Sequence, residues 1–495
     1  MTPVVEELLP PPEAEDACAG LAHLPYRLWF DSAANASRLG RYSFLMADPA
    51  ILIRGRGTGV EIIDRIGGTT RPYEGDALAC VRDLLRAHAS PRLDGIPPFQ
   101  GGAAGYIGYD WGRVLERLPS PRYDDLALDD VVFGVYDWVL AWDHHTRRAW
   151  LISTGMPDAS GEARQRRARA RAVEVKDVLA RAAGQRADAA LPASRAIRGT
   201  PVRSDAAPSF AVEDGWWDPA LDLRSSFTRS GYLEAVARVV EYIHAGDIFQ
   251  TNLSQRFEAP LREPAWDLYK RLRRRNAAPF AGFMELPDAF ILSASPERFL
   301  HVDDRGHVET RPIKGTRPRG IGPEHDAALG QALTESTKDR AENLMIVDLM
   351  RNDLSRVCVP GTVRVPELFA LERYATVHHL VSTVVGDLEA GHDALDLLRA
   401  AFPGGSITGA PKVRAMEIIA ELEPSRRGVY CGSLGYLSVT GELDTSIAIR
   451  TAVVRNGRIY FNAGGGIVAD SKPEQEYRET LDKARGIIDA LALPS

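Results

Sequence analysis

The sequence predicts an α+β fold built from antiparallel strands and helices. Residues 1–180 mix short strand-like runs of alternating polar and apolar residues with a few helical segments. Apolar residues then recur at helical spacing from Leu233 to Ile243, and Gly246 ends that helix. Near the C-terminus, runs at 434–438, 447–454 and 458–462 predict three strands, and Asn456-Gly457 is a strong two-residue hairpin turn.

The composition is typical of a soluble globular protein with ample material for a core. The chain has 495 residues, of which 45% are hydrophobic and 26% charged. A formal net charge of −7 argues against a general nucleic-acid binder, whose surface would be basic. The most apolar stretch, 131–142, is short and contains Asp137, so we expect no segment that spans a membrane.

The cysteines and the first residues indicate a reducing compartment. Residues 1–15 contain prolines and acids where a secretory signal would need a basic start and an apolar run. We therefore expect a cytoplasmic protein. The cysteines lie far apart, which predicts neither a disulfide framework nor a thiolate metal site. They are Cys18, Cys80, Cys358 and Cys431.

The N-terminal region is expected to comprise residues 1–182. Within it, 131–136 followed by 138–140 predicts a buried strand. The stretch from Gly101 to Tyr106 matches neither common phosphate-loop pattern, so it predicts close packing of the backbone. The basic run at 164–171 lies among alanines and favours a helix with a solvated face over an RNA site.

A linker is expected at residues 183–226, followed by a C-terminal region at 227–490. The linker is rich in Ala, Pro, Arg, Ser and Asp and shows little periodicity. After it, the strand predicted at 249–254 carries Gln250, Asn252 and Ser254 on one face. Such a polar face either lines a site or faces water.

Three consecutive glycines follow the last predicted strand. Gly464, Gly465 and Gly466 have no side chains, so their backbone N–H groups are free to approach an anion. The alternative interpretation is a flexible turn.

Two predicted helices carry acids that suit a divalent cation. Glu476, Glu479 and Lys483 have the spacing i, i+3 and i+7, so they project from one helix face. They either bind Mg²⁺ and an acid or form a solvated, salt-bridged surface. The helix predicted at 337–353 adds Glu342. Together with Glu479 it would give Mg²⁺ the few carboxylates that this ion takes from proteins.

Glu297 and Arg450 are candidates for a cleft. Glu297 follows a strand at 290–294, where burial would raise the pKa of its carboxyl and allow it to protonate a departing hydroxyl. It is otherwise a loop acid. Arg450 interrupts an apolar predicted strand, and a buried guanidinium needs an anion, either an internal partner or a substrate carboxylate.

Lys314 lies in a short polar segment, where its amine either points at a bound ligand or is a solvated surface group. The segment is Pro312-Ile313-Lys314-Gly315-Thr316.

Taken together, ordered motifs across about 226–490 resemble the chorismate-utilising enzymes, which include component I of anthranilate synthase and component I of aminodeoxychorismate synthase. The N-terminal half is similar to the family more weakly, through Arg41-Tyr42-Ser43-Phe44. The resemblance implies antiparallel sheets packed as a sandwich, with helices outside and the site in a cleft between the sheets. The motifs include Ser295-Pro296-Glu297-Arg298-Phe299, Asp339-Arg340-Ala341-Glu342-Asn343-Leu344 and Phe402-Pro403-Gly404-Gly405-Ser406-Ile407-Thr408.

The resemblance also implies a role for each candidate. Glu342 and Glu479 would hold Mg²⁺, Glu476 would assist through water, and the ion would bind the ring carboxylate of chorismate. Glu297 would be the general acid. The remaining substrate contacts would be Gly315, Thr316, His379, Ser406, Tyr430, Arg450, Gly464, Gly465, Gly466, Lys483 and Gln250.

Two positions distinguish the members of this family. Relatives that use water carry a lysine at the position of Gln250, so glutamine here favours ammonia as the nucleophile. Anthranilate synthases usually have alanine where this chain has Lys314, whereas aminodeoxychorismate synthases typically have lysine. There the amine attacks ring carbon 2, and ammonia then adds at carbon 4 and expels it. We therefore expect 4-amino-4-deoxychorismate as the product, on the route to folate.

Two alternatives remain, an anthranilate synthase component I and a non-catalytic subunit that binds tryptophan or chorismate. A glutaminase elbow is absent from the sequence, so ammonia would come from solution or from a glutamine amidotransferase subunit. Trp29-Phe30-Asp31-Ser32 departs from the segment that related enzymes use for tryptophan inhibition. A tryptophan pocket is still expected near Ser32, Pro279, Phe280 and Ala281.

Overall fold

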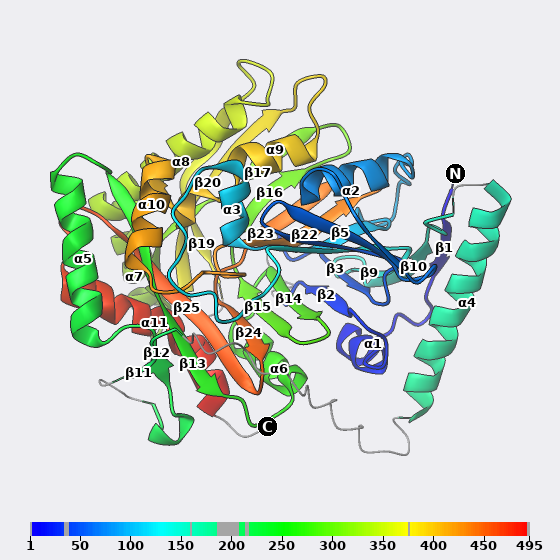
Figure 1. The fold of residues 1–495 in the computed structure, drawn as a ribbon, viewed down its shortest axis with the longest axis horizontal. Helices are drawn as coiled ribbons and strands as arrows, with labels where there is room; N and C mark the ends of the chain where they lie inside the picture. Colours follow the sequence, from blue (N-terminus) through cyan, green and yellow to red (C-terminus); the bar gives the residue numbers. More distant parts are fainter. Residues whose placement is uncertain are drawn as a thin grey trace.

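Two large antiparallel sheets face each other, and helices cover their outer sides (Figure 1). The computed structural model describes residues 2–33, 39–158, 161–185, 207–212, 217–374 and 377–492. Every pair of strands in the sheets of this described part is antiparallel. The predicted α+β fold is confirmed.

The first sheet has 13 strands within the described residues, in the order β1-β10-β9-β3-β2-β14-β15-β24-β25-β13-β12-β11, and β21 pairs with β13. Its strands are β1 (Val4–Glu7), β2 (Leu28–Asp31), β3 (Tyr42–Met46), β9 (Trp138–Asp143), β10 (Arg148–Ser153), β11 (Phe210–Ala211), β12 (Arg224–Ser225), β13 (Gln250–Pro260), β14 (Phe280–Glu285), β15 (Phe290–Ser295), β21 (Gly409–Ala410), β24 (Thr451–Arg455) and β25 (Arg458–Ile467).

The second sheet has 12 strands in the same described ranges, in the order β18-β20-β17-β16-β23-β22-β7-β8-β4-β5-β6, and β19 pairs with β20. Its strands are β4 (Ile51–Arg56), β5 (Gly59–Asp64), β6 (Thr69–Pro72), β7 (Gly102–Ile107), β8 (Val131–Tyr136), β16 (Arg298–Val302), β17 (His307–Thr310), β18 (Ile313–Pro318), β19 (Arg364–Arg373), β20 (Val377–Asp387), β22 (Ser433–Ser438) and β23 (Leu443–Ile447).

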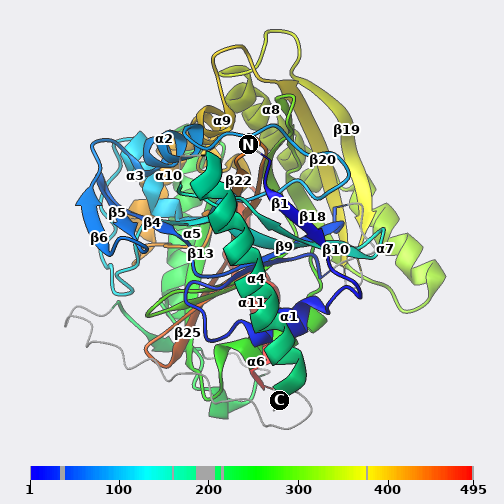
Figure 2. The same cartoon turned by 90° about the vertical axis from the view of Figure 1, so that its right-hand side faces the viewer.

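Each sheet has its own set of helices. Helices α4, α5, α6, α10 and α11 pack on the first sheet, and α2, α7 and α8 pack on the second. Figure 1 shows α5 and α11 at one end of the molecule and α4 at the other, and Figure 2 shows α4 crossing β1, β9 and β10. The helices are α1 (Ala14–Gly20), α2 (Ala77–Arg86), η1 (Tyr109–Trp111), α3 (Gly112–Leu115), α4 (Gly161–Gln185), η2 (Pro219–Leu221), α5 (Arg229–His244), α6 (Ala265–Arg275), α7 (Pro323–Glu335), α8 (Thr337–Ser355), α9 (Ala394–Ala401), η3 (Gly405–Ile407), α10 (Lys412–Leu422) and α11 (Pro473–Ala492).

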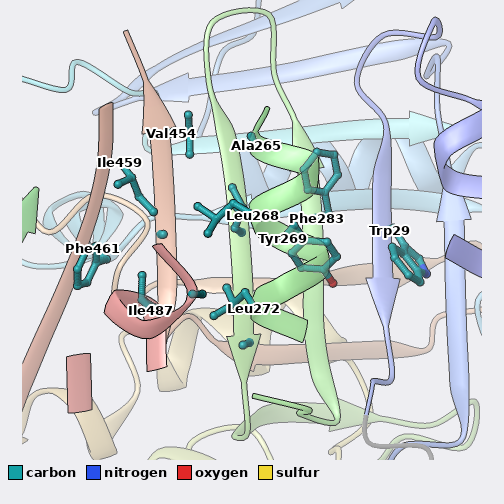
Figure 3. Close-up of a cluster of buried hydrophobic side chains, with 14 of the residues drawn as sticks. Trp29, Ala265, Leu268, Tyr269, Leu272, Phe283, Val454, Ile459, Phe461 and Ile487 are labelled. Carbon is teal, nitrogen blue, oxygen red and sulfur yellow. The ribbon is translucent and has the colours of Figure 1, made fainter. Parts of the chain in front are cut away.

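Three apolar clusters hold these layers together. One lies between the sheets, where Phe44 of the first sheet meets Tyr436 of the second with their ring centroids 5.3 Å apart. The other two fill the space between each sheet and its helices. Figure 3 shows part of the cluster on the first sheet, where Leu268 and Tyr269 of α6 lie beside Phe283 of β14. Burying such side chains is the main favourable contribution to folding.

The chain changes sheets at sharp crossings, and two strand predictions are wrong for that reason. The run at 131–140 is two buried strands, β8 in the second sheet and β9 in the first, separated by Asp137. The run at 447–454 is also broken. Strand β23 ends at Ile447, β24 begins at Thr451, and Arg450 lies between them with a φ of +50°. Each run is mostly apolar on both sides of its charged residue, because the strands on both sides of a crossing are buried.

The N-terminal region supplies strands to the middle of both sheets. Strand β2 lies between β3 and β14, and β7 lies between β8 and β22. The division at 1–182, 183–226 and 227–490 stays a prediction, since much of the expected linker, 186–206 and 213–216, lies outside the described residues. No helix in the described ranges has the length and apolar character needed to cross a membrane.

Two further sequence features have clear packing roles. The glycine-rich stretch forms β7, where a Cβ on Gly105 would overlap the carbonyl oxygen of Val132. Close packing of this backbone is confirmed. The basic run lies in α4 as expected. Its arginines are not all solvated, however. Arg164 is buried and donates to the carbonyl oxygen of Thr154, and Arg171 donates to Asp48.

Candidate active site

The candidate site surrounds two crossings of the chain between the sheets. Glu297 lies in the crossing from β15 to β16, and Arg450 lies in the crossing from β23 to β24. The two crossings run side by side, because Ile447 N–H donates to the carbonyl oxygen of Glu297 and Ala294 N–H donates to that of Arg450, each at 3.1 Å. An acid and a cation distant in sequence are thus joined by backbone hydrogen bonds.

Glu297 has the environment of an acid that keeps its proton near neutral pH. It is 4% exposed, and burial raises its pKa to about 7, although the Ser406 hydroxyl and the Lys314 ammonium oppose the shift. Its Oε1 lies 3.5 Å from the backbone nitrogen of Ile313. Burial of Glu297 thus acts on its pKa in the expected direction.

Lys314 is not a solvated surface lysine. It lies in β18, and its Nζ donates to the carbonyl oxygen of Ser406 at 3.0 Å. Burial lowers the pKa of Lys314 and Lys483 lowers it further, while Glu342 raises it. The amine is thus held within electrostatic reach of the Glu297 carboxyl, with a larger neutral fraction than an exposed lysine has.

Gly315 and Thr316 continue β18 around a bulge. The register against β20 shifts between Ile313 and Thr316, and Gly315 takes a φ of +82° that side chains rarely adopt. The hydroxyl of Thr316 lies 2.9 Å from Nδ1 of His379, and burial lowers the pKa of His379 to about 3. His379 is therefore a neutral imidazole, and its Nε2 has no partner among the described residues.

The three glycines belong to a strand rather than to a flexible turn. Gly464, Gly465 and Gly466 form the end of β25, opposite Ser254, Leu253 and Asn252 of β13. A Cβ at Gly464 would overlap the carbonyl oxygen of Leu253. The missing side chains let the two strands and the neighbouring groups approach closely.

Three candidate residues, Gly466, Gln250 and Lys314, lie close together. A Cβ at Gly466 would overlap Nε2 of Gln250 and would lie 3.6 Å from Nζ of Lys314. Gln250 is 1% exposed, so its strand face lines the interior of the site and does not face water.

The acids of α8 and α11 meet beneath these glycines. A Cβ at Gly465 would lie 3.1 Å from Oε2 of Glu476 and 3.3 Å from Oε1 of Glu479. Glu342 of α8 joins them through Lys338, whose Nζ lies 3.9 Å from both Glu342 and Glu476. Lys338 therefore links the two helices, which sequence periodicity could not place relative to each other.

The protonation of these acids differs. Burial raises the pKa of Glu342 and that of Glu476. Burial acts in the same direction on Glu479, but the ammonium of Lys483, 2.6 Å away, outweighs it and lowers the pKa. Lys483 also donates to the carbonyl oxygen of Gly464 at 2.9 Å, so it links α11 to β25.

These acids suit a hard divalent cation only together with other ligands. Within the described residues, no group of three or more His, Cys, Asp or Glu side chains is arranged to hold a metal ion. Mg²⁺ typically takes one or two protein carboxylates and completes its shell with water and substrate oxygens. Lys338 contacts Glu342 and Glu476, and Gly465 lies next to Glu476 and Glu479. These three carboxylates fit that donor set.

Arg450 and Tyr430 lie in the loops next to the crossings. In the part of the chain that the structure describes, the guanidinium of Arg450 has neither a hydrogen-bond nor an ion-pair partner. Burial lowers its pKa. The interpretation as an internal ion pair is therefore wrong, and the guanidinium is available for an external anion. Tyr430 is 7% exposed, and burial raises its pKa.

A buried ion pair that the sequence patterns did not indicate holds the site loops. Arg427 and Glu423 are both buried and 2.7 Å apart. Arg427 donates to the carbonyl oxygens of Ile407 and Asn252, and Glu423 accepts from the backbone and hydroxyl of Ser254. The i, i+4 spacing could have indicated the pair, but only the fold shows that it joins β13 to the loop of Ser406.

The expected tryptophan pocket lies next to a cavity of about 270 Å³ between the sheets. Ser32, Pro279, Phe280 and Ala281 all line it. The walls also carry Arg298, which stacks on Phe280 and pairs with Asp444. The structure thus provides a cavity at this position, and its occupant stays a prediction.

Comparisons with known proteins agree on one family. The family model described as chorismate binding enzyme matches residues 28–489. The chain is 45% identical to aminodeoxychorismate synthase component 1 of Salmonella typhimurium, over 97% of this chain and 96% of the relative. It is 43% identical to anthranilate synthase component 1 of Streptomyces coelicolor, over 85% of this chain and 78% of the relative.

A solved structure has the same fold. The anthranilate synthase component I from Streptococcus pneumoniae matches with a TM-score of 0.73 at 31% identity, over 91% of this chain and 93% of the other.

Proposed function

The chain belongs to the family of chorismate-binding enzymes, and from this membership we propose that it converts chorismate and ammonia into 4-amino-4-deoxychorismate. The product would serve para-aminobenzoate and folate synthesis. The relative from Salmonella typhimurium supports this choice, because its similarity extends over nearly the whole of both chains.

The observation that carries the proposal is that Lys314 and Glu297 are both buried and both contact Ser406. One is an amine whose pKa burial lowers, and the other is a carboxyl whose pKa burial raises to about 7. Near neutral pH, Glu297 therefore retains a proton that it can donate, and Lys314 has an increased share of the unprotonated form. A covalent displacement by Lys314 needs this combination of protonation states.

The proposed reaction has two displacements. The Nζ of Lys314 forms a bond to ring carbon 2 of chorismate, the ring double bonds shift, and the 4-hydroxyl leaves as water with a proton from Glu297. Ammonia then forms a bond to carbon 4, the double bonds shift back, and the bond from carbon 2 to Nζ breaks. A proton from the incoming nitrogen returns to Glu297, so enzyme and charge are restored.

Arg450 and the neighbouring neutral groups would orient the substrate. The unpartnered guanidinium of Arg450 can bind a carboxylate of chorismate through two parallel hydrogen bonds. Tyr430, Thr316 and the free Nε2 of His379 offer further polar contacts. Ser406 would hold both reacting groups, since its hydroxyl contacts Glu297 and its carbonyl oxygen accepts from Lys314.

Mg²⁺ is the proposed cofactor. Glu342 and Glu479 would hold it directly, and Glu476 would do so through water. When bound, the ion would neutralise the ring carboxylate of chorismate and fix its position. The glycines at 464–466 contribute space, because a side chain at Gly465 would approach both acids of α11.

A glutamine amidotransferase subunit is the proposed source of ammonia. The sequence has no glutaminase elbow, and the relatives are named component 1, which implies a second component. Ammonium salts should replace the partner at sufficiently high concentration.

Product analysis tests the proposed function. Purified protein with chorismate, Mg²⁺ and ammonium should form 4-amino-4-deoxychorismate, detected by mass spectrometry. Anthranilate is the alternative product to look for, because the relative from Streptomyces coelicolor is named anthranilate synthase component 1. Formation of fluorescent anthranilate and pyruvate by this protein alone would contradict the proposal. Well-folded protein that consumes no chorismate under any of these conditions would instead be a binding subunit.

A further inference from the structure

The short turn η3 carries the residue that contacts both proposed reacting groups. Ser406 lies in the middle of this turn, its carbonyl oxygen accepts from Lys314, and its hydroxyl bonds to Glu297. The backbone hydrogen bonds that Ile407 and Thr408 donate within the turn are 3.3 and 3.4 Å long. These bonds are longer than the usual length of about 2.9 to 3.0 Å. Contacts from outside the turn are therefore important for the position of Ser406.

The guanidinium of Arg427 supplies such a contact at the next residue. It donates to the carbonyl oxygen of Ile407 at 2.9 Å and to that of Asn252 on β13 at 2.8 Å. Glu423 accepts from the same guanidinium at 2.7 and 2.9 Å, and it also accepts from the backbone and hydroxyl of Ser254. One side chain thus ties the turn to β13.

This guanidinium is enclosed on its faces as well as at its edges. The side chain is 1% exposed, and its central carbon lies 4.6 Å from the ring centroid of Tyr109 and 5.8 Å from that of Tyr430. The carbonyl oxygen of Arg427 accepts from Tyr430 N–H at 3.2 Å. Stability alone is a weak reason for such a pair, because apolar residues of similar size often replace a buried ion pair without loss.

Resting on the proposed function, we infer that Arg427 is a positioning residue of the reaction, which fixes Ser406 between Glu297 and Lys314 and acts through it. The separate nitrogens of a guanidinium donate to the turn, to the strand and to Glu423 at the same time. A lysine has all its donors on one nitrogen and reaches fewer of these acceptors. The charge of Glu423 balances that of Arg427, so the pair orients the turn without adding net charge.

The position of Ser406 has a measurable consequence for the acid. Burial raises the pKa of Glu297, and the Ser406 hydroxyl opposes this increase by donating to the ionised carboxyl. Displacement of the turn removes that opposition, so the pKa increases further and the alkaline decrease in kcat moves to higher pH. The Lys314 ammonium, the Ile313 N–H and the Cys431 thiol also act on this carboxyl, and all three are retained in the variants below.

Arg427→Lys keeps the charge and loses the separate donors. With ammonium and saturating chorismate, kcat should fall about ten- to a hundredfold, the effect of displacing reacting groups by about 1 Å. The KM for chorismate should stay within about threefold of its original value. The midpoint of the alkaline decrease in kcat should rise by about half to one pH unit, the equivalent of one hydrogen bond. Formation of the adduct on Lys314, followed by intact mass, should become slower.

Ser406→Ala tests whether Arg427 acts through the Ser406 hydroxyl. Alone, it should move the midpoint by the same amount as Arg427→Lys. The double variant should move the midpoint no further, because both changes remove the same contact. Additive shifts would mean that Arg427 acts on Glu297 by another route, and the inference would fail.

Arg426→Lys is the matched control at the adjacent position. Its guanidinium belongs to a separate ion-pair network with Asp110, Asp124 and Asp130. This variant should lower thermal stability and leave the midpoint in place. An equal shift in Arg426→Lys, or a change in thermal stability alone in Arg427→Lys, would show that Arg427 only supports the fold.

Glu423→Gln gives a second test where Arg427→Lys does not fold. The change is nearly isosteric, but it replaces one acceptor of Arg427 by a donor, so the midpoint should rise as well. An unchanged midpoint would overturn the inference. Chorismate consumption is the readout, so anthranilate as the product would overturn only the proposed function, while an unaltered protein that consumes no chorismate would overturn both.

Discussion

At the scale of single residues, burial changes what two ordinary side chains can do. An exposed lysine is protonated and an exposed glutamate is ionised at neutral pH. Enclosure of Lys314 in β18 and of Glu297 at a crossing between the sheets acts against both charges. The same physical cause therefore lowers the pKa of one group and raises that of the other, as the proposed nucleophile and acid require.

Replacing Lys314 tests the covalent step. Lys314→Ala should eliminate the mass of the adduct, because it removes the amine that lies 3.6 Å from a Cβ position at Gly466. Turnover to 4-amino-4-deoxychorismate should fall at least about a hundredfold. Intact-mass measurement after mixing with chorismate and Mg²⁺ gives the result, with Lys176→Ala on α4, whose amine pairs with Glu6, as a control that retains the adduct. An adduct of unchanged amount in Lys314→Ala would identify a different nucleophile.

Replacing Glu297 tests its raised pKa through stability. Between pH 4.5 and about 7 the unfolded chain loses this proton while the folded protein keeps it. Folding stability from this group therefore falls as pH rises through that window. Glu297→Gln removes the dependence, so its stability relative to the unaltered protein should improve by about 2 to 3 kcal/mol between about pH 5 and about pH 8.

Urea unfolding at the two pH values measures this difference. The kcat of Glu297→Gln should fall about 10²- to 10⁴-fold, the usual contribution of a general acid. In the unaltered protein, kcat should decrease as pH rises above about 7, where the acid loses its proton. If the difference in stability between Glu297→Gln and the unaltered protein were the same at both pH values, Glu297 would titrate like an exposed carboxylate.

At the scale of elements, the glycine end of β25 decides how closely other groups approach. In Gly466→Ala the new methyl would overlap Nε2 of Gln250, so Gln250 must move or the strands must separate. We expect a loss of about 1 to 3 kcal/mol in stability and a large decrease in kcat.

Gly282→Ala is the control, since Gly282 lies inside β14 of the same sheet and the nearest atom to a Cβ there is 3.5 Å away. Thermal unfolding and steady-state kinetics compare the two variants. If Gly466→Ala and Gly282→Ala had equal effects, the loss would come from adding a methyl group anywhere in this sheet and not from the position of Gly466.

Helices α8 and α11 together determine the proposed magnesium site. Glu342→Gln should weaken Mg²⁺ binding at least about tenfold, because one of few carboxylate ligands is lost. Stabilisation of the protein by Mg²⁺ in thermal unfolding reports this without relying on activity. Asp348→Asn, an exposed change on the same helix, should leave the stabilisation intact. Normal stabilisation in Glu342→Gln would exclude Glu342 as a ligand.

At the scale of the whole molecule, neither region has a complete sheet of its own. Removing residues 1–182 would remove β2 and β7 and leave β14 and β22 as new edges. Their apolar faces, including Met284 and Leu434 in the cluster between the sheets, would lose partners. We expect the fragment 227–490 to be insoluble or to lack a cooperative unfolding transition. Cooperative unfolding of that fragment, followed by circular dichroism, would show that the C-terminal region folds independently.

Local patterns predicted much of the fold because they depend on neighbouring residues. The hairpin at Asn456-Gly457, the end of α5 at Gly246 and the acid-bearing face of α11 all follow from turn chemistry or helical period. The breaks at Asp137 and Arg450 could not be predicted in this way. An apolar run has the same pattern whether it forms one strand or two strands in different sheets.

The sequence by itself determined which chemical groups were available: an amine at Lys314, an acid at Glu297, amides at Gln250 and Asn252, and glycines at the end of a strand. Only the tertiary structure decided that Gln250 and Lys314 meet at Gly466, that Lys314 and Glu297 both contact Ser406, and that both lie out of water. Desolvation depends on contacts between distant segments, and the crossings between the two sheets bring those segments together.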